Sequence, residues 1–438
     1  MRTIKRFYIS LPLVLLKEKL LHWASQFEEI AWMDSNEYPQ KHTNYEAILA
    51  VDAFTSIKTD YDQSFKALNE YQQNTGDWIF GYLSYDLKND VEALKSNNPD
   101  NLQFPDLYFF QPKKIFFITQ NEIVIHYLNH VKDEIHLDWE DIINQKVSPV
   151  PDQKITSKSS IKIKLKLTKD TYRNKVNTML SHIKRGDIYE ANFCQEFYAE
   201  NSTIDPLMSY IHLNKISKPP FATFFKMNHG YVLSASPERY LKKDGQTILS
   251  QPIKGTSRRS NNPKEDANLK VRLENDTKER SENIMIVDLV RNDLSKSAVK
   301  GSVQVEELCK VYAFKQVHQM ISTIKAEIEP TTTPVTILRQ TFPMGSMTGA
   351  PKIKAMQIIE ALEESKRGLY SGSVGYFTPK GDFDFNVIIR SILYNESLKY
   401  ISVMVGSAIT AKSKPDKEYE ECLLKAKAMR QVLETNTL

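Results

Sequence analysis

The sequence is poor in cysteine: its 438 residues include only Cys194, Cys309 and Cys422. These lie far apart and form no CxxC pair, which excludes a zinc knuckle or a disulfide framework and indicates a reducing compartment. No apolar run approaches the roughly 20 residues that span a bilayer. The opening apolar run is short, Lys17 and Lys19 follow it, and no small-residue cleavage site appears. We therefore expect a cytoplasmic protein that does not enter a membrane.

Several signatures of catalytic sites are also missing. The chain contains no GxxxxGK[ST], HExxH, GxSxG or GxGxxG pattern, so a phosphate loop, a zinc protease site, a hydrolase elbow and a nucleotide cofactor are not indicated. The net charge of +4 is small and the basic residues are dispersed, so we expect no nucleic-acid surface. The lysine-rich stretch at 161–169 alternates with apolar residues and predicts a strand with one solvated face.

The composition and residue pattern of the sequence change along its length. The composition, 41% hydrophobic and 26% charged, is typical of a globular protein with a sizeable core. All four tryptophans lie in the first third, and a polar, proline-containing connection follows at about 138–160. We therefore predict an N-terminal portion, residues 1–145, and a larger C-terminal portion, residues 160–435, that contains the candidate chemistry.

The C-terminal portion mixes helical and strand-like patterns without a strict βαβ alternation. Helices are predicted at 168–187 (capped by Thr168), 278–296, 351–365 and 416–434; strands at 188–200, 371–378, 382–395 and 402–410; and a hairpin at 221–241. This mixture favours an α+β fold over a doubly wound sheet.

Two of the predicted helices each carry a pair of acids three residues apart. Glu279 and Glu282 share one helix face, and Glu418 and Glu421 share another. If the two faces meet, the carboxylates form an oxygen-rich site suited to Mg²⁺. Either pair taken alone is equally typical of a solvated helix face.

Several other polar residues have two readings. Arg390 lies in an apolar run, where a charge needs either a salt bridge or an anionic ligand. Lys425 follows Glu421 by four residues and serves either that acid or a substrate. His318, in an apolar and neutral stretch, is typical of a structural histidine. Glu238 follows a proline at a strand end and is either exposed or, if buried, a candidate general acid.

The stretch Gln251–Arg259, QPIKGTSRR, puts Lys254 between Pro252 and Gly255. Proline fixes one backbone angle and glycine permits unusual ones, so the segment suits a rigid loop that aims the lysine. The alternative is an ordinary surface turn.

Taken in order, eight runs resemble the chorismate-utilising enzymes. The runs are GDIYEANFCQ, SASPERYL, QPIKGTSRR, KERSENIMIVDLVRNDL, MGSMTGAPKIKAMQIIEAL, LYSGSVGYF, FNVIIRSI and VGSAITAKSKPDKEYEECLLKA. The resemblance is strong over residues 165–432, and the first 140 residues resemble the family's more variable N-terminal portion. It implies two packed, antiparallel-rich β-sheets flanked by helices.

Within this family, PIKGT resembles the branch that aminates chorismate at C4, whereas the anthranilate branch has alanine for this lysine. The resemblance implies that the Lys254 amine attacks C2 of chorismate, with Glu238 as general acid and Thr256 beside them in the catalytic set. A nucleophilic lysine must be neutral, so we expect a lowered pKa for Lys254. The product, 4-amino-4-deoxychorismate, serves p-aminobenzoate and folate synthesis.

The resemblance also implies ligands and partners. Glu282 and Glu421 match the direct Mg²⁺ ligands, with Glu279 and Glu418 nearby. The residues that match the substrate pocket are His318, Ser346, Tyr370, Arg390, Gly406, Ser407 and Lys425. Glu190 stands where the isochorismate and salicylate relatives have a water-activating lysine, which argues against those activities.

The chain carries no glutaminase signature, so we expect ammonia from a separate glutaminase subunit. The family's N-terminal portion also allows a bound tryptophan. Two alternatives stay open at this point: the anthranilate branch, and a non-catalytic protein that binds chorismate or tryptophan.

Overall fold

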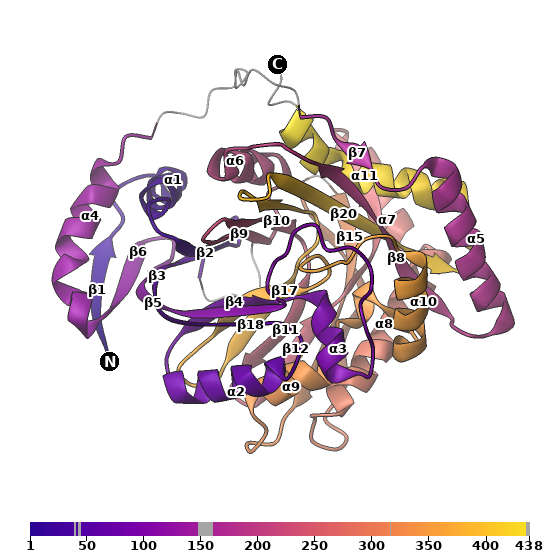
Figure 1. Cartoon of the computed structure of the whole chain (residues 1–438), viewed down its shortest axis with the longest axis horizontal. Coiled ribbons are helices and arrows are strands. Elements are labelled where there is room, and N and C mark those ends of the chain that lie inside the picture. The colour runs from indigo at the N-terminus through magenta and orange to yellow at the C-terminus, as the bar shows by residue number, and fades with distance from the viewer. Residues whose placement is uncertain (39–40, 43–44, 148–160, 316, 435–438) are drawn as a thin grey trace.

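The computed structural model describes residues 1–38, 41–42, 45–147, 161–315 and 317–434 (Figure 1). Within this part of the chain, twenty strands form one hydrogen-bonded network, and the strands pair antiparallel throughout. Helices pack around the network, so the expected α+β class is confirmed. No helix in the described part combines the length and apolarity that a bilayer crossing requires.

The network divides into two sheets at strand β5 (Leu107–Ile118). One edge of β5 pairs with β3 (Ala47–Thr59). On its other edge, the first part of β5 pairs with β4 (Ile79–Leu83) and the second part with β6 (Glu122–Leu128). Pro112, which has no backbone N–H to donate, lies between the two parts. The two expected sheets are therefore present and share strand β5.

The first sheet contains most of the N-terminal strands and several C-terminal ones. Its spatial order is β1 (Arg2–Tyr8), β6, β5, β3, β2 (Glu29–Asp34), β9 (Phe221–Met227), β10 (Gly230–Ser236), β19 (Ser391–Asn395), β20 (Tyr400–Thr410) and β8 (Glu190–Ala199), with the short strands β7 (Lys164–Leu165) and β16 (Gly349–Ala350) on the far edge of β8.

The second sheet runs from β5 into strands that come mostly from the C-terminal portion. Its order is β5, β4, β17 (Ser373–Phe377), β18 (Phe383–Val387), β11 (Arg239–Asp244), β12 (Thr247–Gln251), β15 (Val317–Glu327) and β14 (Gln304–Ala313), and β13 (Ile253–Arg258) follows β12 along the same edge of β15.

The two predicted portions of the chain contribute neighbouring strands to both sheets. N-terminal β2 pairs with C-terminal β9, and N-terminal β4 pairs with C-terminal β17. The predicted connection at about 138–160 overlaps the end of helix α4 (Ile135–Asn144), and its residues 148–160 lie outside the described residues. The division at 145 and 160 stays a prediction about the organisation of the sequence.

Two large apolar cores stabilise this arrangement. One lies between the first sheet and a group of helices: α1 (Leu13–Ala24), α4 (Ile135–Asn144), α5 (Lys169–Arg185), α6 (Pro206–Ser217), α10 (Lys352–Leu362) and α11 (Pro415–Glu434). The other joins the two sheets, where Phe225 of β9 meets the ring of Tyr82 of β4 at 5.7 Å between centroids. It extends to α2 (Ser64–Thr75), α8 (Thr277–Ser295) and α9 (Pro334–Thr341).

Secondary structure was predicted correctly where the periodic apolar pattern extends over many residues. Helix α5 begins after Thr168, whose hydroxyl accepts a hydrogen bond from the Thr171 N–H, as expected for an N-cap. Two strand predictions were wrong. The stretch 161–169 contributes only the two residues of β7, and the predicted strand 382–395 breaks into β18 and β19. Arg390 lies in this break with a φ of 54°, a left-handed conformation that a regular strand does not contain.

Candidate active site

A cavity of about 820 Å³ collects residues that are far apart in the sequence. Strands β13 and β20 and helices α8 and α11 contribute to its walls. All but two of the predicted site residues line it: Glu238, Lys254, Thr256, Glu279, Glu282, Ser346, Tyr370, Arg390, Gly406, Glu418, Glu421 and Lys425. The faces of α8 and α11 that carry the paired acids therefore do open onto one space.

The two exceptions, His318 and Ser407, are buried away from the cavity wall. His318 Nε2 lies 3.0 Å from Asp266 Oδ1, on α7 (Pro263–Glu274), so the structural reading of this histidine fits its surroundings. Ser407 alternates with Gly406 and Ala408 along β20, and these two neighbours line the cavity. Its hydroxyl lies on the other face, 3.9 Å from Cys422 Sγ. The cavity lining therefore does not support the predicted contact of these two side chains with substrate, which stays a prediction.

Lys254 lies in a bulged strand rather than in the predicted turn. The register between β13 and β15 shifts between Ile253 and Thr256, so the residues between them are displaced from regular pairing. Gly255 has a φ of 95°, and a Cβ there would lie 3.2 Å from Glu279 Oε2. The positive φ favours glycine at this position, and the absence of a side chain also leaves room for Glu279 of α8.

Lys254 is held both at its backbone and at its amine. Asn283, on α8, donates from Nδ2 to the Lys254 carbonyl oxygen at 3.2 Å. At the other end of the side chain, Nζ lies 3.2 Å from Glu190 Oε1, and the two side chains are 12% and 2% exposed. This lysine is not part of a solvated surface turn, and the reading that the segment aims its side chain is supported.

The expected lowering of the Lys254 pKa is wrong for the protein in this state. Burial does lower the pKa, but the negative charges of Glu190, Glu282 and Glu238 outweigh burial, and the net shift is upward. The carboxylate neighbours are not evident from the sequence around Lys254. Lys254 is therefore an ammonium ion here.

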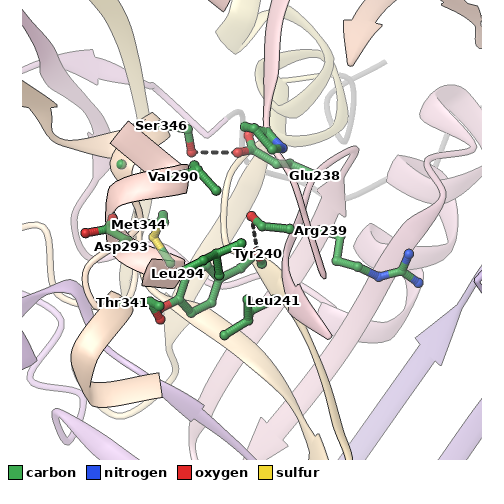
Figure 2. A pocket seen from close by; sticks show the side chains of 13 residues that line it. Glu238, Arg239, Tyr240, Leu241, Val290, Asp293, Leu294, Thr341, Met344 and Ser346 are labelled. Atoms are coloured by element: carbon green, nitrogen blue, oxygen red, sulfur yellow. Dashed lines mark hydrogen bonds between the residues drawn. The ribbon is translucent and has the colours of Figure 1, made fainter. Parts of the chain in front are cut away.

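Glu238 has the character expected of a general acid. Only 4% of it is exposed, and Ser346 Oγ donates a hydrogen bond to its Oε1 at 2.6 Å, a contact that Figure 2 shows beside a smaller cavity. Burial raises its pKa to about 7, although Ser346 and Lys254 act in the opposite direction. A carboxyl group with this pKa exchanges its proton near neutral pH.

The four glutamates of α8 and α11 form an electrostatically strained group. Burial, followed by the charge of Glu282, raises the pKa of Glu279 to about 7. Burial and Glu421 raise the pKa of Glu418. Burial also acts on Glu421, but Lys425 outweighs it and leaves the pKa of that glutamate lowered. Carboxylates that perturb one another in a cavity indicate a site for positive charge.

Lysines take that position in this structure. Lys278 Nζ lies 3.4 Å from Glu282 Oε1, and Lys425 Nζ lies 2.5 Å from Glu421 Oε1. Among the described residues, no three acidic, histidine or cysteine side chains are close enough to form a ready-made metal site. The glutamates are thus gathered in one cavity but are not arranged as a finished coordination sphere.

The cavity also offers groups suited to an anion, next to Glu421. Arg390 makes no ion pair with any residue that the structure describes; its Nη1 donates to the Lys425 carbonyl oxygen at 3.4 Å. The salt-bridge reading of Arg390 is therefore not supported. Burial raises the pKa of Tyr370, which keeps its hydroxyl as a neutral donor. Lys425 also donates to the Gly406 carbonyl oxygen at 2.9 Å.

Three residues of the site were not assigned roles from the sequence. Asn192 lines the cavity, and its Oδ1 would lie 2.4 Å from a Cβ at position 406, so the approach of β8 requires Gly406. Asn283 fixes the backbone of Lys254. Lys278 pairs with Glu282, and its spacing of four residues before that acid on one helix was a signal that could have revealed the pair.

Comparisons with known proteins agree with this geometry. The sequence profile of chorismate binding enzymes matches residues 28–431. The anthranilate synthase component I-like protein of Synechocystis sp. is 35% identical over 84% of this chain and 75% of its own length. Aminodeoxychorismate synthase component 1 of Escherichia coli is 34% identical over 81% of this chain and 76% of its own length. The chain spans only 43% of a longer relative, the probable aminodeoxychorismate synthase of Oryza sativa subsp. japonica.

A solved structure extends the comparison from the sequence to the fold. The crystal structure of anthranilate synthase component I from Streptococcus pneumoniae matches with a TM-score of 0.76 and 25% identity, over 90% of this chain and 95% of that one. The chain therefore belongs to the family of chorismate binding enzymes. Its relatives include both aminodeoxychorismate synthases and anthranilate synthases.

Proposed function

We propose that the protein is the component of an aminodeoxychorismate synthase that converts chorismate and ammonia into 4-amino-4-deoxychorismate, for p-aminobenzoate and folate synthesis. The observation that carries this proposal is Lys254, a buried amine in the cavity wall near a carboxyl group, Glu238, that holds a proton up to about pH 7. The identity to an aminodeoxychorismate synthase component of Escherichia coli supports it.

In the proposed reaction, Lys254 acts first as a nucleophile. The Lys254 ammonium first gives a proton to solvent. The neutral amine then forms a bond to C2 of chorismate, both ring double bonds shift by one position, and the C4–O bond breaks while Glu238 gives its proton to the departing oxygen, which leaves as water. Ammonia then forms a bond to C4, both double bonds shift back, and the C2–N bond to lysine breaks. The Glu238 carboxylate accepts the surplus proton from the new amine. Lysine and glutamate return to their starting states.

The groups at the anion-binding part of the cavity would orient the substrate. Arg390 and the backbone of Gly406 are proposed to hold the carboxylate of the enolpyruvyl group, with Tyr370 and Lys425 beside them. A guanidinium without a carboxylate partner in the described structure has donors available for such a ligand. Thr256, which lies two residues beyond Lys254 and lines the cavity, is proposed to contact the ring.

We also propose Mg²⁺ as the cofactor. The donor set fits the ion, because four carboxylates from two helices line one cavity and burial with mutual repulsion raises the pKa of Glu279 and Glu418. Bound by Glu282 and Glu421, Mg²⁺ would supply a positive charge that clamps a substrate carboxylate. Lys278 and Lys425 must turn away from these two glutamates for this to happen. Glu279 and Glu418 are proposed to lie near these two ligands.

The source of ammonia is proposed to be a separate glutaminase subunit, and a tryptophan bound in the N-terminal portion stays a prediction. The main rival activity is that of an anthranilate synthase component, because the relative in Synechocystis sp. and the solved structure from Streptococcus pneumoniae carry that name. The lysine at position 254 favours amination at C4.

One assay separates the two activities. The purified protein is incubated with chorismate, Mg²⁺ and ammonium chloride, and the products are identified by mass and fluorescence. Our proposal predicts 4-amino-4-deoxychorismate, detected as p-aminobenzoate only after a lyase is added. Fluorescent anthranilate formed directly would contradict it and support the rival.

A further inference from the structure

Glu190, the first residue of β8, lies behind the nucleophile rather than in the cavity. It is 2% exposed and does not line the cavity, so its contact with the site runs through the 3.2 Å pair with Lys254 Nζ. Its second oxygen, Oε2, is buried and has no hydrogen-bond partner among the described residues. The mechanism proposed above leaves this residue without a role.

The simplest structural role, joining two strands, does not account for the pair. Strand β8 is already paired with β20 from Glu190 to Ala199, and β13 is paired with β15. A buried carboxylate with an unsatisfied oxygen costs stability, and pairing it with a lysine does not recover the whole cost. Glu363 is a better satisfied buried carboxylate: both of its oxygens accept from Arg367, and the Cys194 N–H also donates to Oε1. An ion pair that costs stability and lies at a reactive amine indicates that the pair controls the state of that amine.

We propose that Glu190 is a positioning residue for Lys254: it holds the amine at the cavity wall as an ammonium ion and sets the pH at which the amine loses its proton. The inference deepens the proposed function, because the amine is the proposed nucleophile. Three further carboxylates face the same amine, Glu238 after β10, Glu282 on α8 and Glu421 on α11, but none forms an ion pair with it in the described structure. Glu190 is thus the direct partner.

A variant that removes the charge of residue 190 but keeps its shape separates the positioning of the Lys254 amine from its protonation. In Glu190→Gln the side chain keeps an oxygen that can accept from Nζ, but the negative charge is gone, so the ammonium loses stabilisation and its pKa falls. In Glu190→Ala both the charge and the acceptor are lost. We therefore expect the two variants to agree in the protonation of Lys254 and to differ in turnover.

The test measures protonation without relying on turnover. Trace acetylation with acetic anhydride is followed across the alkaline range, and labelling of the Lys254 peptide is quantified by mass spectrometry, with exposed lysines of the same sample as internal reference. In Glu190→Gln, the midpoint should fall by about one to three pH units. Glu196→Gln is the matched control, because Glu196 is also on β8, 4% exposed, and bound by Ser365, Tyr400 and Ser402 outside the cavity. Its midpoint should equal that of the parent.

Turnover of chorismate with ammonium chloride then tests the positioning role. At neutral pH, Glu190→Gln should turn over at least as fast as the parent, whereas Glu190→Ala should lose about 10²-fold in kcat with little change in KM for chorismate. An unchanged labelling midpoint in Glu190→Gln would overturn the proposal. So would a Gln variant that is inactive at every pH, since Glu190 would then be a proton acceptor. Failure of the parent to turn over refutes the proposed function, and the labelling result still decides the role of Glu190.

Discussion

Two clusters of buried charge lie next to each other in this protein, and they differ in how fully they are satisfied. In one, Arg367 binds both oxygens of Glu363 and donates to the carbonyl oxygens of Met347 and Asn192 at 2.7 Å. In the other, the cavity, carboxylates outnumber the lysines that hold them, and burial raises the pKa of several.

The difference indicates two purposes. The Arg367 cluster fixes the segment that carries Met347 and the strand that carries Asn192, so it sets the shape of the cavity wall. The cavity cluster is poorly neutralised by the protein itself, which is typical of a site that awaits a ligand. Substitutions in the first cluster should therefore act on stability, and substitutions in the second should act on binding and chemistry.

The largest effect is expected for Lys254→Ala. Because the proposed route requires the amine as nucleophile, formation of 4-amino-4-deoxychorismate should fall by at least about 10³-fold, with the fold unchanged by circular dichroism. The measurement is product formation at saturating ammonium chloride. Unchanged product formation would remove the nucleophile role.

Next in size is Arg367→Ala, which breaks the satisfied pair and leaves Glu363 buried without its partner. The free energy of unfolding should fall by about 3–5 kcal/mol, measured by urea denaturation. Arg291→Ala is the matched control, because its pair with Asp288 is exposed, and it should change stability by less than about 1 kcal/mol. Equal effects of the two substitutions would contradict the distinction drawn here.

Glu421→Gln tests the proposed cation site. Loss of one direct carboxylate ligand should weaken Mg²⁺ binding by about 10²-fold, measured by calorimetry on the protein without substrate. Asp416→Asn, an exposed acid in the first turn of the same helix, should leave the affinity unchanged. A normal Mg²⁺ titration for Glu421→Gln would refute its assignment as a ligand.

The smallest effect concerns Ser346→Ala. The Ser346 hydroxyl stabilises the Glu238 carboxylate, so its removal should raise the pKa of Glu238 above about 7, by about half a unit to one unit. Glu238 carries its proton below that pKa and loses it as the pH rises. The protonated carboxyl band in infrared spectra, identified by subtracting Glu238→Gln, should therefore persist to higher pH in Ser346→Ala. A band that disappears at the same pH in both proteins would rule out this influence.

Sequence reasoning located most of the cavity because its residues lie in runs with local constraints. Glycine follows Lys254 because residue 255 adopts a positive φ. Acids three residues apart share a helix face wherever that face lies in the fold. The resemblance to a family then indicated which sequence runs belong to one site, which the apolar periodicity of each run alone does not show.

What sequence reasoning missed depends on three-dimensional neighbours. Burial lowers the pKa of Lys254, but nearby carboxylates, Glu190 first among them, outweigh burial and raise it; Glu190 comes from a different sheet, and no local pattern reveals that pairing. The break at Arg390 and the orientation of the buried Ser407 side chain away from the cavity follow from strand register, which tertiary pairing decides. The pairs of Lys278 with Glu282 and of Lys425 with Glu421, by contrast, each lie within one helix, and their spacing of four residues is visible in the sequence.

The most direct test of the central idea is the mass of the Lys254 peptide after the protein meets chorismate in the absence of ammonia. The account predicts a covalent adduct on that lysine, with the mass of chorismate less one water, that disappears when ammonium chloride is added. An unmodified Lys254 in a preparation that still aminates chorismate would contradict it.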